Sequence, residues 1–277
     1  MTRLLFLSAV LWIIWGCSNE SIEVESPTGD QAEELFDPAD IEYDSIVDVR
    51  DSQVYKITKI DGKWWMAENL NYAADSSFCY NDEPDSCAIY GRLYPWTVAM
   101  DIDSMYNEYN ATFDEQIKPT HQGLCPKGWH IPTEKEWEEM LDYADSHNGD
   151  EGIGASMRTG YGWVPHITSE WVNKNFVDRP VAYTNRFGFA ALPAGAKAEK
   201  PLRKSDCAGA YDETALYCGA NSETWFWSAT EINDHRNNSK RAVHLFLHGL
   251  QNNDTFDQSD WGEFSKRAAL SVRCKKN

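Results

Sequence analysis

Six cysteines spread over the last two hundred residues constrain what this chain can fold into more than any other feature. Two pairs are close in sequence and flank short turn-rich loops, which leaves the remaining two cysteines for each other. The expected bridges are Cys79–Cys87, Cys207–Cys218 and Cys125–Cys274. A zinc site would need cysteines about two to four residues apart, and no such spacing occurs among these six. Other connectivities remain open from sequence alone, but the set favours disulfides.

The N-terminus predicts export, and so the oxidising surroundings in which disulfides persist. Arg3 precedes Leu4–Trp15, an apolar run of 12 residues, whereas a membrane span needs about 20. The run fits the hydrophobic region of a secretory signal. It ends in Ile14–Cys17, which resembles a bacterial lipobox and makes Cys17 the expected lipidated first residue of the mature chain. The alternative is an ordinary signal peptide that happens to contain a cysteine.

The segment after Cys17 predicts an acidic tether. Ser18–Asp51 contains twelve Asp or Glu and one basic residue, Arg50. Such a segment buries too little apolar surface to stay compact. The alternative for its end is that Ile41–Val49 forms a short edge strand of the domain. The expected division is therefore a signal peptide over residues 1–16, a lipidated tether over 17–51 and one domain over 52–277.

The net charge excludes several partners. The chain carries −19 in all, of which Ser52–Asn277 carries −9, and no basic stripe is present for nucleic acid or anionic lipid to bind. We expect membrane attachment through the lipid alone, and no nucleic-acid partner.

Two local patterns predict secondary structure strongly. Val54–Ile60 and Lys63–Ala67 are rich in β-forming residues and are separated by Asp-Gly, which favours a two-residue hairpin turn. A helix is expected from Thr133 to about Asp145. Thr133 and Glu136 have the spacing of a capping box. The helix's apolar stripe comprises Trp137, Met140, Leu141 and Ala144.

The rest of the chain predicts short strands and long loops. A weaker helix is expected over Ile153–Arg158. The expected strands are Phe187–Pro193, Trp225–Thr230, Ala242–Leu247 and Ala268–Arg273. One main helix beside many short strands predicts an α+β domain.

An ordered string of segments resembles the FISUMP domain, the major paralogous domain named after Fibrobacter succinogenes. The segments are KWWMAENLNY at 63–72, YGRLYPW at 90–96, CPKGWHIPTEKEW at 125–137, FGFAALPAG at 187–195, WFWSATE at 225–231 and SVRC at 271–274. The resemblance covers essentially all of residues 54–274. The chain departs from the usual pattern in an acidic loop over 104–116, where individual specificity is expected.

That family is in turn similar to sulfatase-modifying-factor domains of the C-type-lectin-like fold. The resemblance implies two small antiparallel sheets, a helix after Pro132 and chain ends brought together. Such a fold would use a Cys125–Cys274 bridge between the helix start and the closing strand. The formylglycine-generating relatives use a reactive cysteine pair on copper, but Cys274 here belongs to the closing strand. We therefore expect no such activity.

Other catalytic and metal patterns are weak. No Ser-His-Asp order or phosphate-binding loop stands out. His244 and His248 lie in an expected strand, where four residues span about 13 Å, too far to share one ion. We expect both on the outward face. The calcium-dependent sugar motifs of C-type lectins are missing, and no cofactor is expected.

Two sets of residues are the candidate ligand-binding sites. The first set consists of oxygen-rich loops that fit Ca²⁺, with ordinary turn formation as the alternative. It contains Glu231, Asn233, Asp234, Asn252, Asn253, Asp254 and Asp257, with Asp254 and Asp257 the expected calcium ligands. The second set is three tryptophans in loop-like contexts, Trp163, Trp171 and Trp261, which would stack on sugar rings if exposed.

The function expected from these features is a non-catalytic recognition or adhesion module on the outer membrane or cell surface. Its ligand would be a plant-wall polysaccharide. The alternatives are a structural envelope protein that binds another protein, and an enzyme on the same scaffold.

Overall fold

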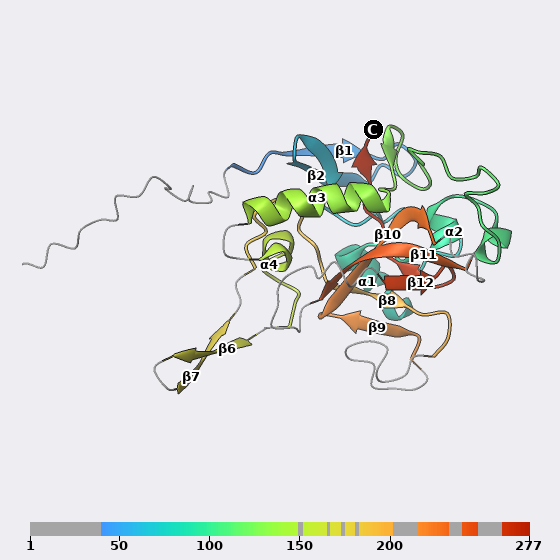
Figure 1. Ribbon diagram of the computed structural model, residues 1–277. Coiled ribbons are helices and arrows are strands. Elements are labelled where there is room, and N and C mark those ends of the chain that lie inside the picture. The colour runs from blue at the N-terminus through green and yellow to red at the C-terminus, as the bar shows by residue number, and fades with distance from the viewer. Residues whose placement is uncertain are drawn as a thin grey trace, which may run out of the picture. The chain divides into compact units, whose positions relative to one another are not determined.

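The computed structural model describes residues 40–148, 152–164, 167–172, 175–180, 183–201, 215–232, 240–248 and 262–277. These residues belong to one compact unit, Phe36–Asn277 (Figure 1). The expected signal peptide, Cys17 and most of the expected tether lie outside them.

A five-stranded antiparallel sheet carries both ends of the described domain. Its order is β1-β2-β3-β14-β5, with β1 at Tyr43–Val47, β2 at Val54–Ile60, β3 at Lys63–Met66, β14 at Lys275–Lys276 and β5 at Trp129–His130. The expected hairpin is confirmed: Asp61 and Gly62 both have positive φ, 49° and 68°. The last strand lies between β3 and β5, so the C-terminus closes the sheet.

The domain starts earlier than expected, because strand β1 is part of it. All five of its residues pair with β2, from Tyr43 opposite Thr58 to Val47 opposite Val54. The edge-strand alternative is therefore confirmed, and the expected domain boundary at Ser52 is wrong. Acidic composition misled here because Asp44 lies on the exposed side of an edge strand, where charge is tolerated.

The second sheet has seven strands in the order β12-β11-β10-β8-β13-β4, with β9 paired to β8. Their bounds are β4 Tyr94–Pro95, β8 Ala194–Lys197, β9 Tyr217–Ala220, β10 Glu223–Glu231, β11 Arg241–His248, β12 Gly262–Ser265 and β13 Ala269–Leu270. The sheet is mixed, because β10 runs parallel to β8, whereas antiparallel sheets were expected. A separate hairpin joins β6 (Ile167–Val172) to β7 (Asn175–Pro180).

Two of the expected strands differ from those observed. Phe187–Pro193 is not a strand, because Gly188 and Ala190 both have positive φ, 68° and 54°, which breaks an extended run. Only Ala191 forms a bridge there, with Arg158, and β8 begins after it. The expected strand over Ala268–Arg273 is reduced to β13 and a bridge at Ser271.

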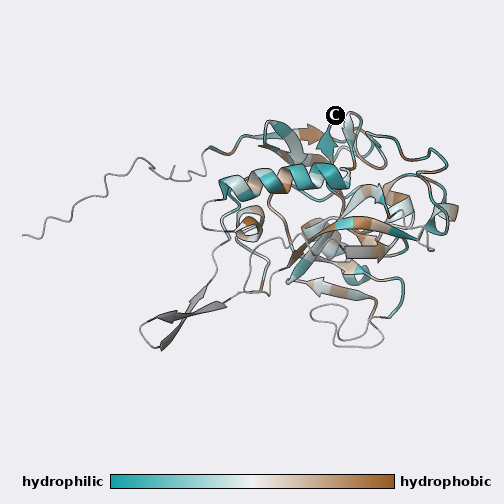
Figure 2. Ribbon diagram, viewed as in Figure 1, coloured by the Kyte–Doolittle hydropathy of each residue, from teal (hydrophilic) through white to brown (hydrophobic). Residues whose placement is uncertain are grey.

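The helices are few and mostly short. Besides α3 at Glu134–His147 they are α1 Pro84–Tyr90, α2 Trp96–Ala99, α4 Ile153–Met157 and the 3₁₀ turns Tyr80–Asp82 and Ser104–Asn107. Both halves of the capping box of α3 are present. The helix runs two residues beyond Asp145, and the ring of its last residue, His147, stacks on Tyr143 with the ring centroids 4.1 Å apart. Figure 2 shows its alternating apolar and polar faces.

Buried tryptophans connect the helix to both sheets. Trp137, on the expected stripe of α3, lies with its ring centroid 5.1 Å from that of Trp65 in the first sheet. In the second sheet, Trp227 Nε1 donates to Tyr94 O at 2.7 Å. Trp96 Nε1 donates to Ser228 O at 2.9 Å. These bonds satisfy the buried indole groups while their rings fill the core.

The domain is thus α+β, with mostly sheet and few helices. Within the described residues no helix is long and apolar enough to cross a bilayer.

Two of the expected disulfides are present, Cys79–Cys87 and Cys125–Cys274. Cys218 is also disulfide-bonded, and Cys207, its expected partner, lies outside the described residues.

Candidate functional site

A surface groove of about 580 Å³ lies where β1, β2, α1 and two loops meet. Six separate stretches of the chain line it. They are Tyr43, Gln53–Lys56, Ala67–Asn69 with Asn71, Cys87–Gly91, residues 159–161, and Asn185 with Ala190 and Leu192. The Cys79–Cys87 disulfide anchors α1, which forms one side of the groove.

Four tyrosines are among the residues that line the groove, Tyr43, Tyr55, Tyr90 and Tyr161. Tyr161 is 71% exposed. The Tyr43 ring carries the ammonium of Lys56 at 3.5 Å from its centroid, and Tyr90 donates its hydroxyl proton to Asn221 Oδ1 at 3.0 Å. Burial raises the pKa of Tyr55 to about 12, so its hydroxyl stays protonated at neutral pH. The groove therefore combines ring faces with hydroxyl groups.

Two asparagines of the KWWMAENLNY segment behave differently. Asn69 is fully engaged: its Oδ1 accepts from Arg273 Nε at 2.8 Å, and its Nδ2 donates to Tyr90 O at 2.8 Å. Asn71 Oδ1 is buried and has no hydrogen-bond partner in the described structure. A buried acceptor without a partner costs about 1–3 kcal/mol. Asn71 is therefore the residue of the groove that carries an unused hydrogen-bond acceptor.

Arg273 supports this wall from beneath. Its side chain is fully buried, and it donates to Ala190 O at 2.8 Å and to Phe189 O. Its carbon Cζ lies 4.2 Å from the centroid of the Phe189 ring. Burial lowers the pKa of Arg273 to about 9, which still leaves it charged at neutral pH. The SVRC segment thus positions Asn69 and the 189–190 turn of the groove.

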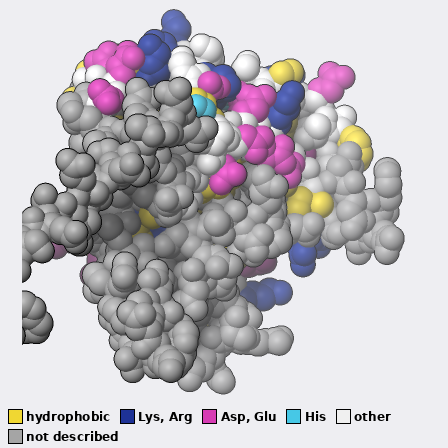
Figure 3. All heavy atoms as spheres, turned by 60° about the vertical axis from the view of Figure 1, so that its left-hand side comes forward, with side chains coloured by type: hydrophobic (Ala, Val, Ile, Leu, Met, Phe, Trp, Pro, Cys, Tyr) yellow, Lys and Arg dark blue, Asp and Glu magenta, His cyan; other side chains and the backbone are white. Residues whose placement is uncertain are grey.

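The groove carries little net charge of its own. Among its lining residues only Lys56 and Glu68 are charged. The Glu68 carboxylate accepts the backbone N–H of Lys56 at 2.7 Å. On the face that Figure 3 shows, the described surface carries several acidic side chains with Lys and Arg side chains between them.

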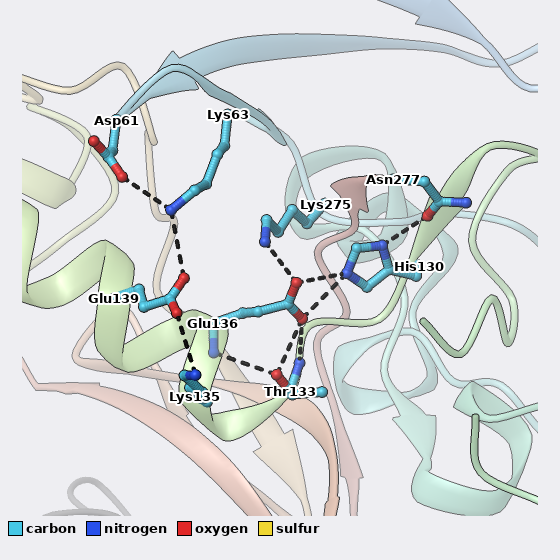
Figure 4. A network of polar contacts seen from close by, with 9 residues as sticks. All are labelled: Asp61, Lys63, His130, Thr133, Lys135, Glu136, Glu139, Lys275 and Asn277. Carbon is cyan, nitrogen blue, oxygen red and sulfur yellow. Dashed lines mark hydrogen bonds and ion pairs between the residues drawn. The ribbon is translucent and has the colours of Figure 1, made fainter. Parts of the chain in front are cut away.

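A second polar cluster joins α3 to the C-terminus (Figure 4). Glu136 accepts from His130 Nε2 at 3.0 Å and from Lys275 Nζ at 2.5 Å, as well as from the Thr133 N–H. His130 Nδ1 bonds Asn277 Oδ1 at 2.7 Å. Each group thus has a partner within the cluster, and none of the five lines the groove. The cluster holds the closing strand β14 against the helix start.

The structure places Glu231 in the core, so its expected role in an oxygen-rich loop is wrong. Its carboxylate forms an ion pair with Lys266, whose side chain is 0% exposed. It also accepts the N–H groups of Ala111 and Thr112 at 2.9 and 2.6 Å. Lys266 Nζ donates to Tyr106 O at 2.8 Å as well. This buried pair anchors the acidic 104–116 loop.

Trp163 is also not the exposed residue that was expected. Only 8% of it is exposed, and its Nε1 donates to Ala191 O at 3.1 Å. Trp171 lies in strand β6, opposite Phe176, and not in a loop. Trp261 lies outside the described residues.

The other calcium candidates, Asn233, Asp234, Asn252, Asn253, Asp254 and Asp257, lie outside the described residues as well. In the part of the chain that the structure describes, no three His, Cys, Asp or Glu side chains gather as a metal site.

His244 corrects another expectation. It lies in β11, as expected for a strand, but it is buried against Phe264, with the ring centroids 5.0 Å apart. Its expected place on an outward face is wrong. Burial lowers its pKa to about 3, so it is neutral in the core.

Sequence reasoning missed the groove. Asn69, Asn71 and Tyr90 lie in segments that were recognised for their family resemblance, but none of the three was among the candidate site residues. Tyr161 follows Gly160 in a short turn that carried no motif. An Asn-x-Asn pair just after a strand is the one local signal, and only the tertiary structure brings it beside α1 and Tyr161.

Comparison with known proteins gives one finding. Neither the curated proteins nor the solved structures yield a match to this chain. The family model described as the Fibrobacter succinogenes major domain matches residues 58–276, from β2 to β14. The chain therefore belongs to the Fibrobacter succinogenes major domain family.

Proposed function

We propose that this protein is a non-catalytic recognition module that binds a glycan in the groove. The observation that carries the proposal is the lining, in which the exposed ring of Tyr161 lies with Asn71, whose buried Oδ1 has no hydrogen-bond partner among the described residues. Sugar rings offer apolar faces to aromatic side chains and hydroxyl protons to amide oxygens. A groove of about 580 Å³ is in the usual range for small-molecule ligands, about 300–1,000 Å³.

The proposed setting is the cell envelope. In this account the chain is exported, Cys17 carries the lipid, and an acidic tether displays the domain at the outer membrane or cell surface. The disulfides Cys79–Cys87 and Cys125–Cys274 support an oxidising compartment. A Cys17→Ser variant should then shift from the membrane fraction to the soluble fraction. Equal membrane association of both forms would contradict the lipid anchor.

We also propose a C-type-lectin-like architecture. The two ends of the described domain, β1 and β14, belong to one sheet, and Cys125–Cys274 links the segment before α3 to the segment before β14. These are the features that the family resemblance implies. The domain uses them to display the groove, without a cofactor.

A plant-wall polysaccharide is the proposed ligand, and affinity electrophoresis tests it. The full chain would be run through gels containing cellulose derivatives, xylan or cell-wall extracts. We expect retardation on at least one of them. Tyr161→Ala should lower the affinity for that glycan about tenfold, and so reduce the retardation, since removal of an aromatic anchor costs about 1–2 kcal/mol.

A matched control is Tyr109→Ala. Tyr109 is 59% exposed, lies on the 104–116 loop and does not line the groove. It should bind as the wild type does. Retardation on none of the glycans, or equal losses in the two variants, would contradict glycan binding in the groove.

A protein ligand in the envelope is the second candidate. It is favoured by three exposed apolar side chains, Met105, Tyr109 and Phe113, on the anchored 104–116 loop. In that case Tyr109→Ala, and not Tyr161→Ala, would lose binding.

A further inference from the structure

Strand β1 contributes to the groove although it lies outside the part of the chain that the family model matches. The match begins at residue 58. Five lining residues precede it: Tyr43 in β1, and Gln53, Val54, Tyr55 and Lys56 before and within β2. One side of the groove is therefore built by residues beyond the matched region.

Specific contacts dock β1 in this position. Asn185 Nδ2 donates to the Tyr43 hydroxyl at 3.4 Å, and the Lys56 ammonium lies over the Tyr43 ring. Lys59 forms an ion pair with Glu42 at 3.1 Å. Tyr43 is thus held between β2 and the loop that also gives Asn185 to the groove.

Gly188 is the position against which the start of this strand packs. A Cβ added at Gly188 would lie 2.5 Å from Ile41 Cγ2, 2.8 Å from Tyr43 Cε1 and 2.7 Å from Thr58 Oγ1 of β2. All three distances are well inside van der Waals contact, and two of the three atoms belong to the segment of β1. The position therefore accepts the N-terminal segment only because it carries no side chain.

We propose that β1 is a specificity-determining wall of the groove and that Tyr43 contacts the bound glycan. This inference rests on the proposed function, because it assigns part of the same site. Tyr43 is a second aromatic side chain in the lining to which Tyr161 belongs. The family region provides the floor of the groove, and the segment before it provides this wall.

Binding to a glycan that retards the wild type tests the proposal. Tyr43→Ala should weaken binding about tenfold, while Tyr43→Phe, which keeps the ring, should stay within about twofold. If Tyr43→Ala binds as the wild type does while Tyr161→Ala loses binding, the role of β1 is overturned and the groove stands. If the wild type binds no glycan, both proposals are overturned.

A second experiment measures the docking of β1 without any ligand. Gly188 and Gly62 both have φ of 68°, but a Cβ at Gly62 would meet nothing within 4 Å. Each Gly→Ala change therefore carries similar backbone strain, and only Gly188→Ala adds the clash. Amide hydrogen exchange over Tyr43–Val47 should accelerate at least tenfold in Gly188→Ala and stay unchanged in Gly62→Ala. Equal exchange in the two variants would contradict the packing of β1 against Gly188.

Discussion

At the scale of single residues, Lys266 and Glu231 form a buried ion pair in which each charge has the other as its partner. Lys266 has no exposed surface, and burial lowers its pKa, while the carboxylate of Glu231 raises it. The same carboxylate holds the backbone of the 104–116 loop through Ala111 and Thr112. The pair therefore links a strand of the core to a surface loop.

Removal of either partner should destabilise the domain strongly. Lys266→Met leaves Glu231 as a buried charge without its cation, and breaking such a pair costs about 3–5 kcal/mol. Urea unfolding followed by tryptophan fluorescence measures the loss. Lys135→Ala is the control, because Lys135 is exposed and its ion pair with Glu139 is long, with 3.9 Å between Nζ and Oε1. It should change stability by less than about 0.5 kcal/mol. Equal effects would contradict the anchor.

His244 predicts a pH dependence of stability. Burial depresses its pKa in the folded state to about 3 from an ordinary value of 6.5. The unfolded chain therefore takes up a proton first, so stability is complete above pH 6.5 and falls as the pH falls towards 3. His244→Phe should flatten this part of the stability curve. Thermal unfolding between pH 7 and 4 measures it, and parallel curves for the two proteins would contradict the assignment.

At the scale of elements, α3 shows what local sequence determines. Its capping box, its apolar stripe and its start follow from residues 133–144, because capping and periodicity act within a few residues. The hairpin at Asp61-Gly62 is local in the same way. Phe187–Pro193 shows the opposite: it is β-forming by composition, but it adopts a turn that seats β1 and accepts from Arg273. That outcome depends on contacts far apart in sequence.

Glu136 has two roles at the start of α3: it completes the capping box, and its charge attracts His130 and Lys275. Burial raises the pKa of Glu136, and the hydrogen bonds of His130, Lys275 and Thr133 outweigh it and bring the pKa to about 2. Because the folded-state pKa is depressed, this stability is present above the ordinary value of 4.5 and is lost as the pH falls towards 2.

Glu136→Gln can still serve the capping box but loses the charge. We expect lower stability at pH 6 and a weaker acid-dependent loss between pH 4.5 and 2. Urea unfolding of both proteins at pH 6 and at intervals between pH 4.5 and 2 tests this. A variant that loses as much stability on acidification as the wild type would contradict the role of the charge.

At the scale of the whole molecule, the two disulfides close loops of very different size. Cys125 and Cys274 are 149 residues apart in sequence, and Cys79 and Cys87 are 8 apart. The chain-entropy model gives about 5 kcal/mol for the long loop and about 2.5 kcal/mol for the short one. Paired Cys→Ser variants compared by urea unfolding should show this order. The reverse order would contradict the closing role of Cys125–Cys274.

The groove shows why the site was harder to predict than the fold. The cysteine spacings indicated both bridges, and the family segments indicated a sheet-rich domain. Asn71 and Tyr161 lie ninety residues apart in sequence. Asn71 belongs to a family segment that does not indicate a binding role, and Tyr161 belongs to no motif. The expected candidates Trp163 and Glu231 have the chemistry of ligand-binding residues, but both are buried in the core. Burial of a single aromatic or acid depends on tertiary packing, which local patterns do not contain.

Hydrogen–deuterium exchange of the full chain, with and without a saturating glycan that retards it, tests glycan recognition in the groove most directly. Bound ligand should protect the backbone amides around Tyr43, Lys56, Asn71, Tyr90 and Tyr161, which line one groove but lie far apart in sequence. Amides of the 104–116 loop should exchange at the same rate in both samples. Protection confined to that loop, or to residues outside the groove, would contradict the account.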